Sequence, residues 1–273
     1  KVPLVLADLD STETLVTAMT GCDVVFHLAG HYPRFSIEKD KTLALALGQM
    51  DRVLEAAATT KIQRLIYVSS TATVAPRQGQ KSTEADVFDR PPGFGTYHDL
   101  KWALEDRVNV NANFEAITVC PSACLGPWDL RVGTSAMLVA TARGMRVPHP
   151  DGIVSWVDAR DVATALVRVA KHPSPPKRLI VSGGQTSMHS FLCDAAQRYG
   201  VLPPPAALSA AVAEALADAQ EARAVHSGGR AELSRELVDL IAHGVELDAS
   251  LSRESLSMSY RPLRETLDAF DAW

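Results

Sequence analysis

The sequence predicts an α/β fold with a doubly wound, mostly parallel sheet, joined to a smaller, mostly helical lobe. Short apolar segments without polar alternation, such as residues 23–30 and 64–70, are typical of strands that helices cover on both faces. Longer amphipathic segments of helical spacing, such as residues 41–59 and 97–111, lie between them. Strands and helices that alternate in this way favour right-handed crossovers, and therefore a parallel sheet.

The first half of the chain supplies most of the expected sheet. Residues 2–8 (VPLVLAD) are expected to be a strand, and Asp10 or Ser11 can cap a helix that ends before Gly21. The next expected elements are a strand at 23–30, a helix at 41–59, a strand at 64–70, a helix at 97–111 and a strand at 116–120. Ligands bind beyond the carboxyl ends of such strands, and these ends carry small and polar residues here.

Beyond Gly126 the alternation is less regular. The expected elements are a helix at 134–144, a strand at 152–157, a helix at 161–171, a strand at 178–182 that extends the sheet, and a helix in the alanine-rich segment 206–224. We assign residues 1–126 with 154–182 to the sheet domain. Residues 127–153 with 183–273 are assigned to a lobe that caps the ligand-binding edge of the sheet.

Composition and charge narrow the possible functions. A chain of 273 residues with 47% hydrophobic residues can bury a large core, and its net charge of −5 with dispersed Lys and Arg argues against a nucleic-acid partner. No apolar run approaches the roughly 20 residues that span a bilayer, so no membrane contact is expected. Four cysteines without a C-x-x-C pair, and no signal-peptide pattern, favour a cytoplasmic location. We therefore expect a small-molecule substrate.

Tyr97 and Lys101 lie four residues apart in the helix expected at 97–111, so they share one face of it. A free tyrosine titrates near pH 10, and a fixed cation nearby favours the phenolate, as proton transfer at neutral pH requires. The spacing alone fits an ordinary pair of surface residues equally well. Hydroxyl-bearing residues that end the neighbouring strands favour a catalytic site instead, namely Ser69, Ser70, Thr71 and Ser122.

Several motifs follow one another in a recognisable order. They are ADL at 7–9, VVFHLAG at 24–30, YVSST at 67–71, YHDLK at 97–101, PSACLGP at 121–127 and VDARDVA at 157–163. Together they resemble the extended short-chain dehydrogenases/reductases of the NAD-dependent epimerase/dehydratase group, over nearly the whole chain. The loop after the YVSST motif and the PWDLR segment at 127–131 are most similar to dihydroflavonol reductases, 3β-hydroxysteroid dehydrogenases and hopanoid-associated relatives.

This resemblance implies a Rossmann-like fold and an enzyme that binds NAD or NADP along the strand ends. Tyr97 would be the catalytic proton donor or acceptor, Lys101 would hold the nicotinamide ribose, and Thr71, in place of the usual serine, would orient the substrate oxygen. The cofactor-binding residues that the resemblance implies are Asp8, Leu9, Leu28, Ala29, Gly30, Ser69, Tyr97, Lys101, Pro121 and Ser122. The implied reaction interconverts a carbonyl and an alcohol on a small, fairly apolar molecule.

The sequence departs from the family pattern in two places. Relatives begin with a strand, a G-x-x-G-x-x-G turn that binds the pyrophosphate, a helix and a second strand, whereas this sequence begins at the family's third strand. We therefore expect an N-terminally incomplete Rossmann-like domain, either a fragment of a longer protein or a degenerate relative that cannot hold a dinucleotide. The second departure is Ala46, which stands where relatives usually carry an active-site asparagine.

Other polar residues have ordinary structural explanations. His27 is expected to be packed or beside the cofactor, and His98 is expected to be solvated on another face of its helix. Asp158 and Asp161 start a helix, where capping accounts for both. No His, Cys or Asp cluster has the sequence spacing of a metal site, so no metal is expected.

Two alternative functions stay open from the sequence. The protein could be a nucleotide-sugar epimerase or dehydratase, for which a pocket with Arg131 and Arg143 around a diphosphate would be the sign. It could also be a non-catalytic relative that senses the cofactor or binds a partner. A homodimer through the helices at 41–59 and 97–111 is possible by analogy with relatives.

Overall fold

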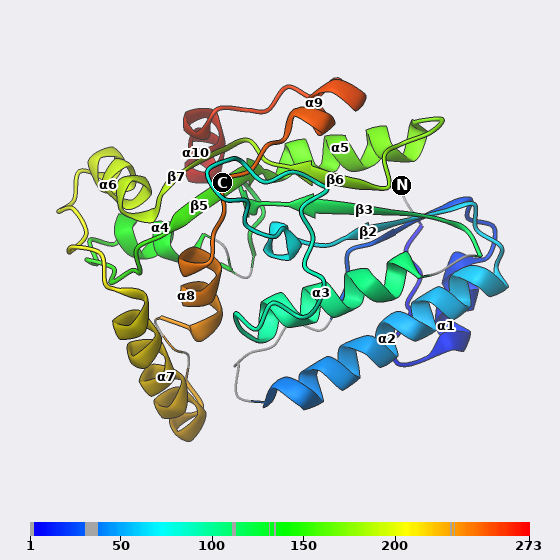
Figure 1. Cartoon of the computed structure of the whole chain (residues 1–273), viewed down its shortest axis with the longest axis horizontal. Coiled ribbons are helices and arrows are strands. Elements are labelled where there is room, and N and C mark those ends of the chain that lie inside the picture. Colours follow the sequence, from blue (N-terminus) through cyan, green and yellow to red (C-terminus); the bar gives the residue numbers. More distant parts are fainter. Residues whose placement is uncertain are drawn as a thin grey trace.

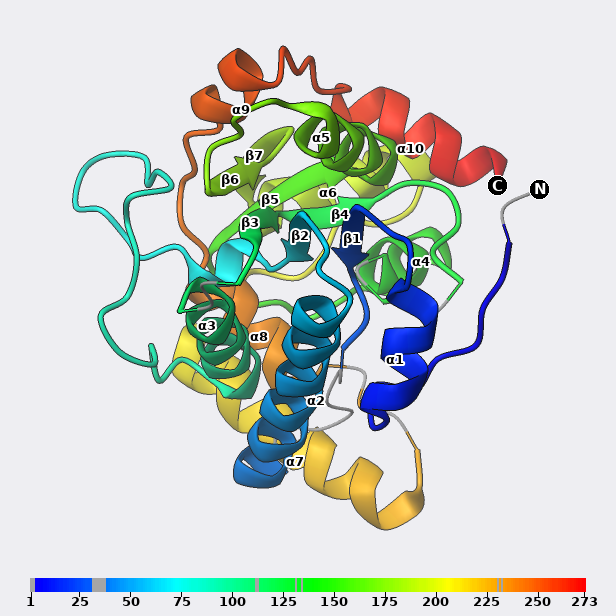
Figure 2. The same ribbon diagram turned by 90° about the vertical axis from the view of Figure 1, so that its right-hand side faces the viewer.

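The computed structural model describes residues 3–30, 38–110, 113–130, 132–133, 135–229, 231 and 233–273. Its main sheet has four parallel strands in the order β1-β2-β3-β6, of which Figure 1 labels β2, β3 and β6 and Figure 2 labels all. These strands are β1 (Val24–His27), β2 (Arg64–Val68), β3 (Glu115–Pro121) and β6 (Arg178–Val181). All four match strands expected from the sequence, and the parallel pairing confirms the predicted α/β class.

Helices cover both faces of this sheet (Figure 2). One face packs against α1 (Thr12–Met19), α2 (Lys39–Thr59) and α3 (Thr96–Asn109), and the other against α5 (Ala159–Lys171). Side chains of β2 alternate between the two layers, because Tyr67 packs with α2 and α3 whereas Ile66 packs with α5. The strands are buried on both sides, as their continuous apolar sequences predict.

A second, smaller sheet is built from strands before and after β6 in the chain. It contains β4 (Ala123–Leu125), β5 (Ile153–Asp158) and β7 (Gly184–Ser187), with β5 parallel to β4 and antiparallel to β7. Only β5 was expected from the sequence, because β4 has three residues and β7, with the sequence GQTS, has no apolar side chain. This sheet packs against α4 (Ala136–Ala142), α6 (Met188–Tyr199) and α10 (Leu263–Ala272).

The remaining elements are helical. They are the 3₁₀ helix η2 (Thr71–Thr73), α7 (Ala210–Ser227), α8 (Arg235–Ala242) and α9 (Ser250–Ser255). Helices α7 and α8 pack on each other, and α8 contacts α3, as Figure 1 shows at the lower left of the molecule. Residues 127–153 with 183–273, assigned to the smaller lobe, are mostly helical. The boundaries of this lobe stay a prediction. No helix in the described part of the chain is both long and apolar enough to cross a bilayer.

The expected strand at 2–8 is wrong. The described residues 3–8 have no strand conformation, and Leu4 and Leu6 are 99% and 95% exposed. A strand needs a partner for its backbone hydrogen bonds, and among the described residues no strand lies beside this segment. The helix that follows forms as expected, because the Ser11 hydroxyl caps α1 by accepting a hydrogen bond from the amide of Thr14.

Candidate active site

Tyr97 and Lys101 lie in the first two turns of α3. The helix begins after Gly95, whose φ of 144° favours glycine, and the Asp99 carboxylate lies in its first turn, where the helix dipole favours negative charge. Tyr97 is 9% exposed. The Lys101 ammonium lies 5.9 Å from the centroid of the Tyr97 ring and donates a 3.4 Å hydrogen bond to the Val68 carbonyl at the end of β2. The two side chains therefore lie together beside the end of a strand.

Burial dominates the electrostatics around Lys101. It lowers the pKa of the Lys101 ammonium, while the nearby Cys120, Glu105 and Glu236 raise it. Burial, and then the charge of Lys101, lowers the pKa of His27 to about 4. His27 is therefore neutral at pH 7 and far too weak a base to compete for protons there, so its expected packing role fits its surroundings.

A cavity lies at the ends of β1 and β2, and a second cavity adjoins it. The first, of about 150 Å³, is bounded by Lys101, by Ser69 and by the segment after β1, and the second, of about 470 Å³, lies beside residues 6–9. Leu9 and Gln49 line both. Of the expected cofactor-binding residues, the first cavity contains Leu9, Leu28, Ala29, Gly30, Ser69 and Lys101, and the second contains Asp8 and Leu9.

The hydroxyls at the end of β2 have different surroundings. Ser69 is 4% exposed, and its hydroxyl donates a 2.9 Å hydrogen bond to Glu105. Thr71 begins η2 and is half-buried, and no described residue hydrogen-bonds its hydroxyl. Ser70 caps η2 by accepting from the amide of Ala72. Thr71 is therefore the hydroxyl of this loop that is available to a ligand, while Ser69 is held by the protein.

The remaining expected site residues lie at the end of β3. Pro121 is the last residue of that strand, and Ser122 follows it, 5% exposed. The Ser122 hydroxyl has no hydrogen-bond partner among the described residues, which is unusual for a buried polar atom. Neither residue lines the two cavities, nor do Tyr97 and Thr71.

Glu105 and Arg178 are site-supporting residues that the sequence analysis missed. Glu105 lies one turn beyond Lys101 and accepts hydrogen bonds from Ser69 at 2.9 Å, from Thr73 at 2.7 Å and from Arg178 at 2.5 Å. Arg178 also donates to the Thr73 carbonyl and hydroxyl. This network fixes the loop that carries Thr71 against α3. The only sequence signal for this network was the position of Glu105, on the same helix face as Tyr97 and Lys101.

Three other polar residues have structural roles near the site. Asp158 caps α5 by accepting a 2.8 Å hydrogen bond from the amide of Arg160, as expected. Asp161 accepts from the amide of Arg261 at 2.8 Å. The expectation of a solvated His98 is wrong, because this side chain is 3% exposed and packs edge-on against Phe94. Packing by the loop before α3 and by α8 cannot be seen in the periodicity of α3 itself.

Sequence comparisons find relatives over most of the chain. Residues 1–182 match the NAD dependent epimerase/dehydratase family. A ketoreductase from Stigmatella aurantiaca, named for 4-hydroxy-2-methyl-3-oxo-4-farnesyl-3,4-dihydroquinoline-1-oxide, is 27% identical over 267 residues, covering 94% of this chain and 78% of that protein. A putative dihydroflavonol 4-reductase from Synechocystis sp. is 26% identical over 163 residues, 58% of this chain. The match spans about half of the cyanobacterial protein, 47% of its length.

Solved structures share the fold. A nucleoside-diphosphate-sugar epimerase from Pseudomonas aeruginosa superposes with a TM-score of 0.77 at 24% identity, over 98% of this chain and 81% of that one. Gre2 from Candida albicans, solved in complex with NADPH, superposes with a TM-score of 0.69 at 18% identity, over 97% and 81% of the two chains. These similarities confirm the Rossmann-like architecture.

Proposed function

Because the chain belongs to the NAD dependent epimerase/dehydratase family, we propose that it is an oxidoreductase that interconverts a carbonyl and an alcohol with Tyr97, Lys101 and Thr71. Its cofactor is NAD or NADP, as in the family. One observation carries the proposal. The Lys101 ammonium lies beside the Tyr97 ring and lines the cavity at the ends of β1 and β2, where open α/β sheets bind ligands.

The cavity residues fit a dinucleotide. Leu28 is 62% exposed directly after β1, and a Cβ at Gly30 would meet no atom within 4 Å, so this segment is open to a flat ring system. Among the described residues Lys101 donates one hydrogen bond, to a carbonyl, and therefore keeps donors for ribose hydroxyls. The second cavity, beside Asp8 and Leu9, would take the adenosine half. The bound cofactor supplies or accepts the hydride.

Proton transfer is the task of the protein in this proposal. In reduction, the Tyr97 hydroxyl gives its proton to the carbonyl oxygen, and the Lys101 ammonium stabilises the phenolate that remains. The Thr71 hydroxyl donates a hydrogen bond to the same oxygen and so orients it. In oxidation, the Tyr97 phenolate takes the proton of the alcohol. The Glu105 network holds the Thr71 loop at a fixed position relative to α3 during either reaction.

A fairly apolar carbonyl compound is the proposed substrate class. The Stigmatella aurantiaca relative is named for a farnesylated oxo compound, which has these properties. In this chain, Trp128 and Leu130 are 74% and 79% exposed in the segment that follows β4, and they offer apolar surface to such a molecule. Of the arginines expected for a nucleotide-sugar diphosphate, Arg131 lies outside the described residues and Arg143 is exposed at the end of α4.

A Tyr97→Phe variant tests the proposed function. We expect it to lose about 10²- to 10⁴-fold in kcat on an aliphatic or aryl ketone while it still binds NADPH or NADH, measured by nicotinamide fluorescence. Tyr67→Phe is the matched control, because it removes a phenol whose ring centroid lies 5.6 Å from the Lys101 ammonium and that has no proposed catalytic role. Turnover of nucleotide sugars but not of ketones would support the epimerase alternative. Full activity of Tyr97→Phe, or cofactor binding without any turnover, would contradict the proposal.

A further inference from the structure

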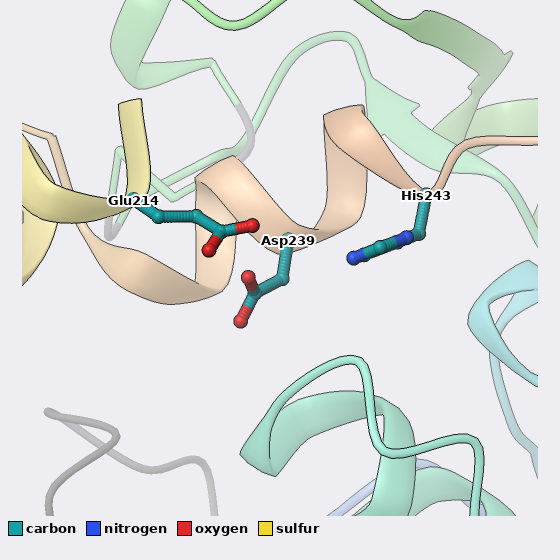
Figure 3. Close-up of side chains that lie close together, drawn as sticks. All are labelled: Glu214, Asp239 and His243. Atoms are coloured by element: carbon teal, nitrogen blue, oxygen red, sulfur yellow. The ribbon is translucent and has the colours of Figure 1, made fainter. Parts of the chain in front are cut away.

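Three metal-ligating side chains converge where α7 meets α8. Glu214 comes from α7, Asp239 from α8, and His243 directly follows α8, and their ligand atoms all lie within 4.8 Å of one another. Figure 3 shows the two carboxylates and the imidazole turned toward a common space beside α8. Within the described part of the chain, no other group of three or more His, Cys, Asp and Glu side chains has its ligand atoms this close together.

Asp239 has an unsatisfied oxygen in this cluster. Its side chain is 2% exposed, and its Oδ1 accepts a 2.7 Å hydrogen bond from Arg235, whereas its Oδ2 is buried with no partner among the described residues. A buried carboxylate oxygen without a partner destabilises the folded state, so such atoms normally have a donor or a cation beside them. An ion bound here would remove that penalty.

The charge of the cluster is not balanced. Arg235 pairs with Asp239, with Glu214 at 3.2 Å and with Asp218 at 3.1 Å, so three carboxylates face one guanidinium. An excess of two negative charges remains. Arg235 reaches Oδ1 of Asp239 and Oε2 of Glu214, and each carboxylate keeps a second oxygen for another cation. The guanidinium therefore orients these ligands as an outer-shell residue does around a metal.

His243 is held in a ligand-competent state. Its ring stacks on Phe94, with centroids 4.0 Å apart and planes 8° from parallel, which fixes its orientation. A nitrogen of this fixed ring lies within 4.8 Å of a carboxylate oxygen of Glu214 and of Asp239.

We propose that Glu214, Asp239 and His243 bind a first-row divalent ion, Zn²⁺ by preference, that joins α7 to α8 beside the start of α3. Two carboxylates and one imidazole suit Zn²⁺, whereas Mg²⁺ and Ca²⁺ prefer oxygen ligands alone. Ligand atoms around tetrahedral zinc lie ~3.4 Å apart, so the cluster must contract by about 1 Å. Glu214, whose side chain is 31% exposed, can make this movement by a rotamer change.

The metal-binding cluster lies against the loop that leads into α3. Asp239 lies against Gly95, immediately before Thr96 and Tyr97, and His243 stacks on Phe94 in the same loop. A metal at this point would hold in place the two side chains of the helical lobe that pack on the loop before α3. The ion would stabilise the structure, and the inference holds whether or not Tyr97 is catalytic.

Zinc titration of the metal-depleted protein tests the inference. Competition with a chromophoric chelator should give one Zn²⁺ per chain, and Asp239→Asn and His243→Gln should each weaken binding at least about 100-fold. The matched control is Asp218→Asn, which removes a neighbouring acid that also pairs with Arg235 but is not in the ligand set. This control should bind Zn²⁺ nearly as well as the unchanged protein. Zn²⁺ should also raise the melting temperature, and Mg²⁺ should not.

Some outcomes would overturn the inference. One is Zn²⁺ binding that Asp239→Asn and His243→Gln leave unchanged but Cys193→Ser abolishes, since His189 and Cys193 form another nitrogen and sulfur pair, 3.6 Å apart. Another is no binding above the level of stray surface sites. Glu214→Gln is a further variant for the case that the buried substitutions fail to fold, because Glu214 is partly exposed and its replacement leaves the core intact. This variant should bind Zn²⁺ more weakly and keep the circular dichroism spectrum of the unchanged protein.

Discussion

The guanidinium of Arg178 lies 2.5 Å from the carboxylate of Glu105, and both side chains are largely buried, at 12% and 7% exposure. The pair joins β6 to α3, although 73 residues separate its members along the chain. Because Glu105 also accepts from Ser69 and Thr73, the same carboxylate fixes both ends of the loop that contains Thr71. The candidate active site therefore depends on a buried ion pair that lies behind it.

Replacement of Glu105 by glutamine should destabilise the fold strongly. The substitution leaves Arg178 buried without its counter-ion, and breaking a buried pair from one side typically costs about 3–5 kcal/mol. Urea unfolding measures the loss. Glu115→Gln is the control, because Glu115 also pairs with an arginine, Arg64. Glu115 is 41% exposed, so water can solvate the pair and the loss of the negative charge should cost little. Equal losses in the two variants would contradict this account of Glu105.

Replacement of Lys101 by methionine should weaken both cofactor binding and turnover. Methionine keeps the apolar stem but removes the ammonium that lines the cavity and lies beside Tyr97. We expect kcat to fall about 100-fold or more, together with a weaker Kd for the nicotinamide cofactor. Lys39→Met, which removes the ammonium paired with Asp99 near the same helix, should change neither quantity by as much.

His27 should make the protein less stable in mild acid. Its pKa is about 4 in the folded protein and near 6.5 in the unfolded chain, so the unfolded state binds more protons between these values. The contribution is fully present above pH 6.5 and is lost as the pH falls to 4, by roughly 3 kcal/mol in all. His27→Gln should flatten this part of the pH profile of the unfolding free energy. An unchanged slope would show that His27 titrates normally in the folded state.

Gly95 should not tolerate a side chain. Its φ of 144° is strained for other residues, and a Cβ there would collide with the Asp239 carboxylate. We expect Gly95→Ala to cost about 2–4 kcal/mol of unfolding free energy, measured by thermal or urea denaturation. Gly93→Ala is the control in the same loop, because its φ is also positive, at 75°, but a Cβ would meet nothing within 4 Å. It should cost only about 1 kcal/mol.

The sequence was sufficient for the elements whose periodicity is strong. The parallel strands at 64–70 and 116–120 and the long helices α2 and α3 come from local patterns of apolar residues, which survive in any arrangement of the chain. The segment 2–8 has an equally apolar pattern but forms no strand in the described residues. Strand formation depends on a neighbour that may lie anywhere in the sequence, and a local pattern carries no information about it.

The candidate site was predictable to the extent that it follows from helix geometry. Tyr97 and Lys101 share a face because they are four residues apart, and their relation to Val68 follows from the order of elements. The Glu105–Arg178 pair and the cluster of Glu214 with Asp239 and His243 depend on contacts between distant segments. A sequence without pairing information does not specify such contacts.

The network around Glu105 has a practical consequence for work on this protein. One buried carboxylate accepts hydrogen bonds from Ser69, Thr73 and Arg178, so the end of β2, the helix η2 and the strand β6 all depend on it. A substitution at any of these partners is therefore expected to lower turnover without removing a reacting group. The unfolding free energy of each such variant has to be measured before its loss of activity is assigned to chemistry.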